Sequence, residues 1–134
     1  MNSFLVAEKT VVTAKGDGEA VDVSAASSRV FLLTLDITNI IEQESIDVSI
    51  FGSADGAAWG PKPIVGFPQK FYREQSPLLL DLTAHPDVKF VRAQWNVARW
   101  GRGAETPMFE FGVALREVPA NILKEAAAEA RAMA

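Results

Sequence analysis

The sequence contains no cysteine and only one histidine, and these two shortages remove several kinds of chemistry. Without cysteine the chain has no disulfide, no thiolate metal site and no cysteine nucleophile. Metal sites built on histidine usually take two or three of them, and no serine stands in a G-x-S-x-G elbow that would pair with a histidine in a hydrolase. The single histidine, His85, precedes Pro86 between two strand-like segments, so we interpret it as a turn residue.

Positive charge is also scarce, because 13 Lys and Arg are outnumbered by 17 Asp and Glu, for a net charge of −4. The basic residues are spread along the chain, whereas a nucleic-acid partner needs them gathered on one surface. Long apolar runs are missing too. Charged residues appear at Glu8 and Lys9, so the apolar stretch before them is too short for a signal peptide. No apolar stretch is long enough to span a membrane. We therefore expect cytoplasmic synthesis, no nucleic-acid partner and no membrane span.

The carboxylates are numerous but scattered. Asp17, Asp55 and Asp87 stand beside glycine or proline, where aspartate stabilises turns. No D-x-D-x-D-G run marks an EF-hand, and no glycine-rich phosphate loop follows a strand-like segment. A calcium ion held by one turn carboxylate and carbonyls stays open as an alternative, and a glycosidase pair cannot be judged from spacing along the chain. The residue types therefore predict a protein that is not an enzyme and holds no metal or cofactor.

The chain is rich in a two-residue hydrophobic period. Residues 30–39, 46–50, 78–82, 91–97 and 109–115 alternate apolar and polar side chains, as half-buried strands do. Parallel strands buried on both faces read as unbroken apolar runs, so the alternation predicts antiparallel sheets. The apolar members predict the core, which we expect to contain Phe31, Leu33, Leu35, Ile37, Ile46, Val48, Ile50, Leu80, Trp95, Val97, Phe111, Val113 and Leu115.

Weaker strand patterns cover residues 5–14, 19–23 and 62–67, and turn sequences separate the segments. The turn sequences are Lys15-Gly16-Asp17-Gly18, Gly52-Ser53-Ala54-Asp55-Gly56, His85-Pro86-Asp87 and Gly101-Arg102-Gly103. About eight strands joined by turns predict a mostly-β, antiparallel two-sheet sandwich, with jelly-roll topology as the first choice.

The hydrophobic period changes after Leu115. Pro119 suits the first turn of a helix, and residues 120–134 consist almost entirely of strong helix formers. One stripe of that helix carries Ile122, Ala126, Ala130 and Met133. A helix this short is marginal alone and needs its own sandwich or a neighbouring subunit to pack on. We therefore expect one domain: a β-sandwich over residues 1–118, and a helix over 119–134 that packs on it or on a neighbour.

The segment Gly52-Ser53-Ala54-Asp55-Gly56-Ala57-Ala58-Trp59 carries an S-x-D-G-x-x-W pattern at the end of a strand. This pattern resembles a hairpin of galactose-binding-like sandwiches, other carbohydrate-binding modules, and β-domains of phage tail and virion proteins. The resemblance implies a tight turn at Asp55-Gly56, with Trp59 folding back to close one end of the sandwich. It covers this hairpin and the preceding strand, and the helix-forming tail departs from the sugar-binding modules. It implies a fold and leaves function open.

A second aromatic cluster runs from Trp95 to Gly103. Because Trp95 and Trp100 are an odd number of residues apart, an unbroken strand places Trp95 in the core and Trp100 outside. Trp100 between Arg99 and Arg102 has the composition of an interface hot spot or a sugar-stacking platform. The alternative is that Trp100 caps the sandwich edge while the arginines pair with nearby acids.

Composition and pattern together favour a non-catalytic structural protein that assembles into a homo-oligomer, as in virion, tail or shell assemblies. Hydrophobic residues make up 49% of the chain, a high share for a small domain, which indicates apolar surface covered by another copy or by a partner. The predicted contacts are Trp100, Arg99 and Arg102, together with the stripe Ile122, Ala126, Ala130 and Met133. The alternative function is a carbohydrate-binding module that uses exposed aromatic residues.

Overall fold

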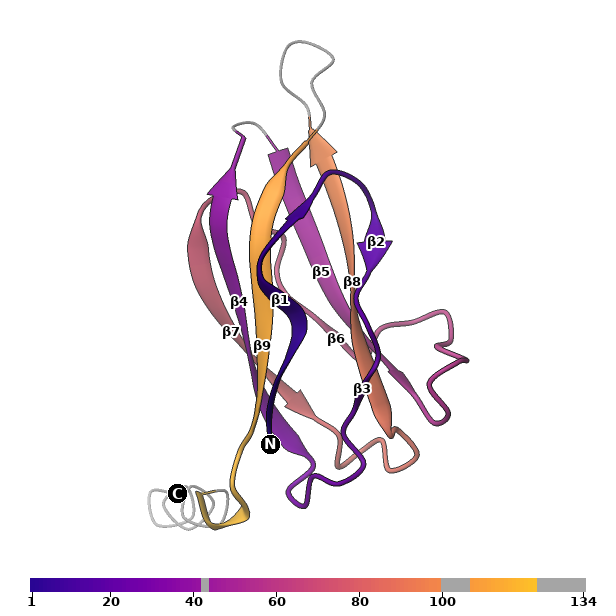
Figure 1. Ribbon diagram of the computed structural model, residues 1–134. Coiled ribbons are helices and arrows are strands. Elements are labelled where there is room, and N and C mark those ends of the chain that lie inside the picture. Colours follow the sequence, from indigo (N-terminus) through magenta and orange to yellow (C-terminus); the bar gives the residue numbers. More distant parts are fainter. Residues whose placement is uncertain (42–43, 100–106, 123–134) are drawn as a thin grey trace, which may run out of the picture.

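The computed structural model describes residues 1–41, 44–99 and 107–122, and the strands in that part of the chain form two antiparallel sheets packed face to face (Figure 1). The first sheet has the order β1-β9-β4-β7, and the second has the order β2-β8-β5-β6, with β3 also paired to β8. The strands are β1 (Asn2–Val12), β2 (Gly16–Asp17), β3 (Val21–Asp22), β4 (Val30–Ile40), β5 (Glu44–Ser53), β6 (Val65–Gly66), β7 (Glu74–Asp81), β8 (Phe90–Arg99) and β9 (Phe109–Glu117).

The connectivity is that of a jelly roll. The short strands β2 and β3 pair with β8 at separate points along its length, so they act as two pieces of one interrupted strand. Counted in this way, successive strands lie in the first, second, first, second, second, first, second and first sheet. Two four-stranded layers with this alternation are the double-sheet jelly roll. The predicted fold class is confirmed.

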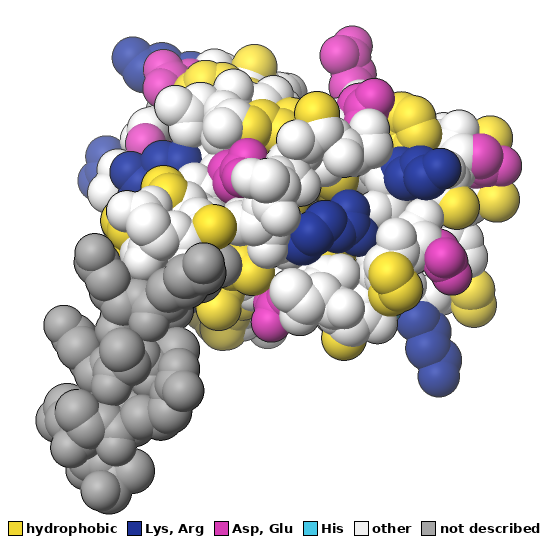
Figure 2. All heavy atoms as spheres, turned by 90° about the horizontal axis from the view of Figure 1, so that it is seen from below, with side chains coloured by type: hydrophobic (Ala, Val, Ile, Leu, Met, Phe, Trp, Pro, Cys, Tyr) yellow, Lys and Arg dark blue, Asp and Glu magenta, His cyan; other side chains and the backbone are white. Residues whose placement is uncertain are grey.

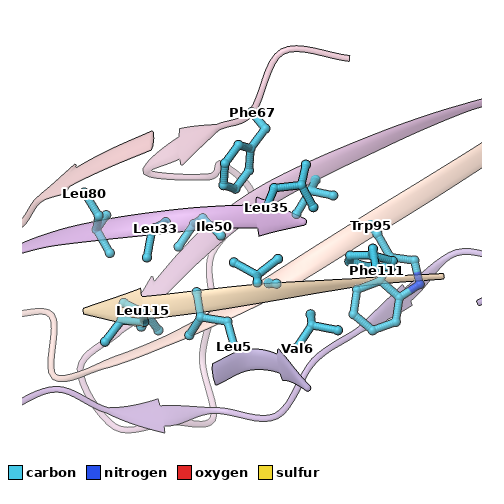
Figure 3. Close-up of a cluster of buried hydrophobic side chains, with 14 of the residues drawn as sticks. Leu5, Val6, Leu33, Leu35, Ile50, Phe67, Leu80, Trp95, Phe111 and Leu115 are labelled. Carbon is cyan, nitrogen blue, oxygen red and sulfur yellow. The ribbon is translucent and has the colours of Figure 1, made fainter. Parts of the chain in front are cut away.

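The hydrophobic core lies between the two sheets, and side chains from both layers interdigitate in it (Figure 3). All predicted core residues are buried except Val97, which is partly buried against the others. Trp95 of β8 meets Phe111 of β9 edge to face, with ring centroids 5.6 Å apart, so this aromatic pair joins the two sheets. Leu5, Val6 and Phe67 add to the core from segments with weaker strand patterns.

One predicted turn contains a strand instead. Gly16 and Asp17 form β2, which pairs with Trp95 and Gln94 of β8. A Cβ on Gly16 would lie 2.9 Å from Cζ2 of Trp95, and the indole N–H of Trp95 donates a hydrogen bond to the carbonyl of Ala14 at 3.1 Å. Glycine lets the backbone close over the indole ring, and this contact with a residue far along the chain holds the segment against β8.

The C-terminal end of the described chain leaves β9 at Glu117 and turns at Pro119. Residues 120–122 are helical, and the N–H of Ile122 donates to the carbonyl of Pro119 at 3.1 Å. The rest of the predicted helix, residues 123–134, lies outside the described residues. Within residues 1–41, 44–99 and 107–122, no helix is long and apolar enough to cross a membrane.

Candidate binding face

The outer face of the first sheet is shaped by two bulges in β1, the first near its start. Phe4 pairs with Ala114 and Val6 pairs with Val113, which leaves Leu5 as an extra residue. Leu5 and Val6 are both buried, so two successive side chains point into the core. Phe4 is left on the outer face, where 46% of it is exposed.

The second bulge forms a raised wall on the same face. Residues 7–9 stand opposite the single residue Gly112 and fold over it, since a Cβ on Gly112 would lie 2.9 Å from the Cα of Glu8. Lys9 takes a φ of 57°, in the left-handed region that lysine rarely adopts. Gly112 is therefore the residue that allows the chain to cross above β9 at this point.

A groove of about 230 Å³ lies beside this wall. Asp36 is the Cα partner of both Gly112 and Gln75, which places it on the floor between β9 and β7. Among the residues that the structure describes, the side chains of Thr34, Asp36 and Gln75 make no hydrogen bond or ion pair with one another or with other residues. Four strands line the groove with Phe4, Glu8, Lys9, Thr34, Asp36, Thr38, Gln75, Gly112 and Ala114.

The other half of the face is apolar, and we call Phe4, Leu32, Pro77, Leu79 and Ala114 the apolar patch. In the strand register, one row across the sheet is Phe4, Ala114, Thr34 and Pro77, and the next row is Asn2, Arg116, Leu32 and Leu79. Leu79 is 56% exposed. A shallow, mostly apolar hollow of about 260 Å³ adjoins Phe4 along β1 and β9.

The S-x-D-G-x-x-W segment folds into a turn held by its own side chains. The Ser53 hydroxyl lies 3.0 Å from Asp55 Oδ1, and it accepts the N–H of Gly56 at 2.9 Å. The N–H groups of Ala57 and Ala58 donate to the same Asp55 oxygen at 2.9 and 3.0 Å. The Ala58 N–H, followed by that of Ala57 and the Ser53 hydroxyl, lowers the pKa of Asp55 to about 2. Within this loop, Oδ1 of Asp55, one of the three turn carboxylates named from the sequence, is therefore already engaged.

Trp59 packs against a side chain of the second sheet, on the face opposite to the core. The guanidinium carbon of Arg92, on β8, is 4.5 Å from the centroid of a Trp59 ring. Arg92 also lies 3.9 Å from the carboxylate of Asp17, on β2. The loop after β5 is therefore tied to β8 and β2 by contacts between sequence-distant residues.

His85 occupies the turn region between β7 and β8, as predicted. Its carbonyl accepts a hydrogen bond from the Arg29 guanidinium at 2.8 Å. The backbone of His85 therefore helps to hold the residue before β4 against the turn between β7 and β8. On the end of the sandwich shown in Figure 2, basic and acidic side chains are interspersed with small apolar areas. The described residues contain no group of three or more His, Asp or Glu placed to hold a metal ion.

The contacts predicted from the sequence fall largely beyond what the structure describes. Trp100, Arg102, Ala126, Ala130 and Met133 lie outside the described residues. Arg99 ends β8, with its backbone opposite Glu44 of β5. Ile122 is 50% exposed.

The outer face of the first sheet was not predicted as a site. The alternation in β4 correctly assigns Thr34, Asp36 and Thr38 to a polar face. The bulges in β1 carry no comparable signal, so neither the exposure of Phe4 nor the wall at Glu8 and Lys9 follows from the sequence. No protein-family model matches this chain, and no curated protein matches it.

Proposed function

We propose that this chain is a non-catalytic structural protein that assembles with copies of itself, and that the apolar patch forms a contact between copies. The observation that carries the proposal is the exposure of Phe4 and Leu79, at 46% and 56%, on neighbouring rows of one sheet face. Scattered exposed apolar residues are ordinary on monomers, whereas apolar side chains that adjoin across several strands are typical of interfaces. Covering them gains about 25 cal/mol for each Å² of apolar surface removed from water.

The charges around the patch suit a contact between two identical faces. Arg116 lies in the same row as Leu32, and Asp36 and Asp81 lie on the same face at either side of the patch. In a two-fold contact the same surface meets itself in reverse, so Arg116 of one copy approaches the carboxylates of the other. Arginine is well suited to pairing with carboxylates at interfaces.

The nearest sheet edge is poorly suited to association by strand addition. β7 is the edge strand of the first sheet, and Pro77 lies near its middle. Proline has no N–H to donate, and natural sheets use it to keep edges from pairing with other chains. This arrangement supports contact through the face of the sheet in preference to its edge.

The proposal that the protein is non-catalytic rests on which residue types are present and on the hydrogen bonds that they already make. The only histidine sits in an exposed turn, and Asp55 already accepts several hydrogen bonds within its own loop. Trp100, Arg99, Arg102 and the stripe from Ile122 to Met133 are proposed as further contacts between copies, on the sequence argument alone.

Light scattering and sedimentation of the purified chain over a range of concentrations test the assembly. We expect the wild type to form a discrete oligomer and Leu79→Lys to shift it toward the monomer without unfolding it, because Leu79 is exposed. Tyr72→Lys is the matched control: Tyr72 is 69% exposed and lies outside the patch, so its variant should keep the wild-type mass. A wild type that stays monomeric at the highest soluble concentration would overturn the proposal.

A further inference from the structure

We infer that the groove of about 230 Å³ on the first sheet binds a neutral carbohydrate through Thr34, Asp36, Gln75 and the ring of Phe4. This inference does not require self-assembly, although the groove adjoins the proposed contact between copies. It rests on the polar half of the face, whereas the proposed contact between copies rests on the apolar patch. Phe4 and Ala114 belong to both sets of residues, and Asp36 also lies beside the proposed contact between copies, so Gln75 and Leu79 are the residues used to tell the two proposals apart.

Three polar side chains that line the groove have unused hydrogen-bonding capacity. Asp36 and Gln75 are direct cross-strand partners on the outer face, a position that brings Cβ atoms to about 5 Å. Neither side chain bonds to another residue within the described chain, and the Thr34 hydroxyl in the next row is likewise without a protein partner there. By contrast, Thr38 at the far end is engaged, since its hydroxyl lies 2.8 Å from a carboxylate oxygen of Glu110.

These groups match the chemistry of a sugar ring. A carboxylate accepts hydrogen bonds from neighbouring hydroxyls, while the amide of glutamine both donates and accepts. Each sugar hydroxyl also donates and accepts, so Asp36, Gln75 and Thr34 together satisfy a set of adjacent hydroxyls. Phe4, 46% exposed at the border of the groove, offers a flat apolar surface for the C–H face of the ring.

The floor of the groove is low where a ring would lie. Gly112 has no side chain and Ala114 has only a methyl group, whereas the bulge at Glu8 and Lys9 rises beside them. The volume is below the roughly 300–1,000 Å³ of pockets that enclose drug-sized ligands. The groove therefore suits one ring, or a chain lying across it, and not a large buried ligand.

Charge selects a neutral sugar over an acidic one. Glu8 and Asp36 supply two carboxylates to the lining, against the single ammonium group of Lys9. A phosphate or uronate would meet Asp36 on the floor between β9 and β7, and the repulsion would disfavour it. Neutral polysaccharides carry no such cost.

Affinity electrophoresis in native gels that contain soluble β-glucan, xylan or galactomannan tests the inference. We expect at least one of these polysaccharides to retard the wild-type chain. Gln75→Ala and Asp36→Ala should each weaken the retardation at least tenfold. Asp87→Ala is the control for loss of a carboxylate, because Asp87 is exposed in the turn after β7 and should leave the retardation unchanged.

Two further results separate this site from the assembly contact. Leu79→Lys should change the particle mass and leave retardation in place, whereas Gln75→Ala should do the reverse. Thermal midpoints within a few degrees of the wild type would show that the variants are folded, and Gln75 is exposed enough to make this the expected result. Migration unaffected by all three polysaccharides, or equal retardation of wild type and both groove variants, would overturn the inference.

Discussion

Oε1 of Glu44 accepts a hydrogen bond from the backbone N–H of Met108 at 2.7 Å. Glu44 is the first residue of β5, and Met108 directly precedes β9. The other carboxylate oxygen accepts the N–H of Ile41 at 2.8 Å. Glu44 is only 1% exposed, so a charged side chain is buried at the end of the sandwich where β4, β5 and β9 meet. It satisfies two backbone donors that would otherwise lack partners.

Replacing this carboxylate should destabilise the fold. Glu44→Ala leaves the N–H groups of Ile41 and Met108 without acceptors, each at a cost of about 1–3 kcal/mol if they stay buried. Glu44→Gln keeps one acceptor and should lose less. The free energy of unfolding from urea titrations measures both effects. Equal stability of wild type and Glu44→Ala would show that water replaces the carboxylate.

Truncation in the core should cost far more than truncation on the apolar patch. Leu35 is 1% exposed between the sheets, so Leu35→Ala should lower the free energy of unfolding by roughly 2–5 kcal/mol. Leu79→Ala, at a 56% exposed position on the neighbouring strand, is the matched control. It should change the stability of the dissociated chain by less than about 1 kcal/mol. A reversed order would place β4 out of register by one residue.

A methyl group at Gly112 should disturb the bulge that forms the groove wall. Its Cβ would lie 2.9 Å from the Cα of Glu8, and backbone cannot move aside as a flexible side chain does. We expect Gly112→Ala to cost about 1–3 kcal/mol through forced overpacking. Gly66→Ala is the control, because its nearest neighbours would be 3.5 and 3.7 Å away. Similar melting temperatures for the two variants would contradict the close crossing.

The hydrogen bonds to the ionised Asp55 carboxylate should stabilise the fold, and this stabilisation should be lost in acid. The pKa of Asp55 is lowered from an ordinary 3.8 to about 2 by hydrogen bonds from Ala58, Ala57 and Ser53. A carboxyl whose pKa is lower in the folded state stabilises that state above its unfolded pKa, and the effect is lost as the pH falls through the folded pKa. Carbon-detected NMR of the Asp55 carboxyl should therefore give a midpoint near 2, and Ser53→Ala should raise it. A midpoint near 4 would show that the loop bonds do not form in solution.

Deleting residues 120–134 tests the contacts proposed from the sequence. If the stripe Ile122, Ala126, Ala130 and Met133 joins copies, the deletion should reduce the particle mass before it unfolds the domain, and Trp100→Ala should act in the same direction. Light scattering alongside circular dichroism separates the two effects. A deletion that lowers the melting temperature at unchanged mass would instead place the helix on its own sandwich.

The sequence by itself determined the layered architecture and most of the core. The alternation of Phe31, Leu33, Leu35 and Ile37 sets which face of β4 is buried, because side chains in a strand point to opposite faces in turn. The same rule placed Trp95 in the core. Turn residues mark where the strands end, and five alternating segments with three weaker ones leave few arrangements other than a sandwich.

The sequence placed Thr34 and Asp36 on a polar face, but only the tertiary structure decided that a groove forms there. Three residues of β1 stand opposite Gly112 because β9 offers room there, and this crossing raises Glu8 and Lys9 beside Asp36 and Gln75. In the same way, the packing of Gly16 against Trp95 explains why residues predicted as a turn form the strand β2. Bulges and such close crossings depend on residues about 75 to 105 positions apart, and a local period carries no information about partners at that distance.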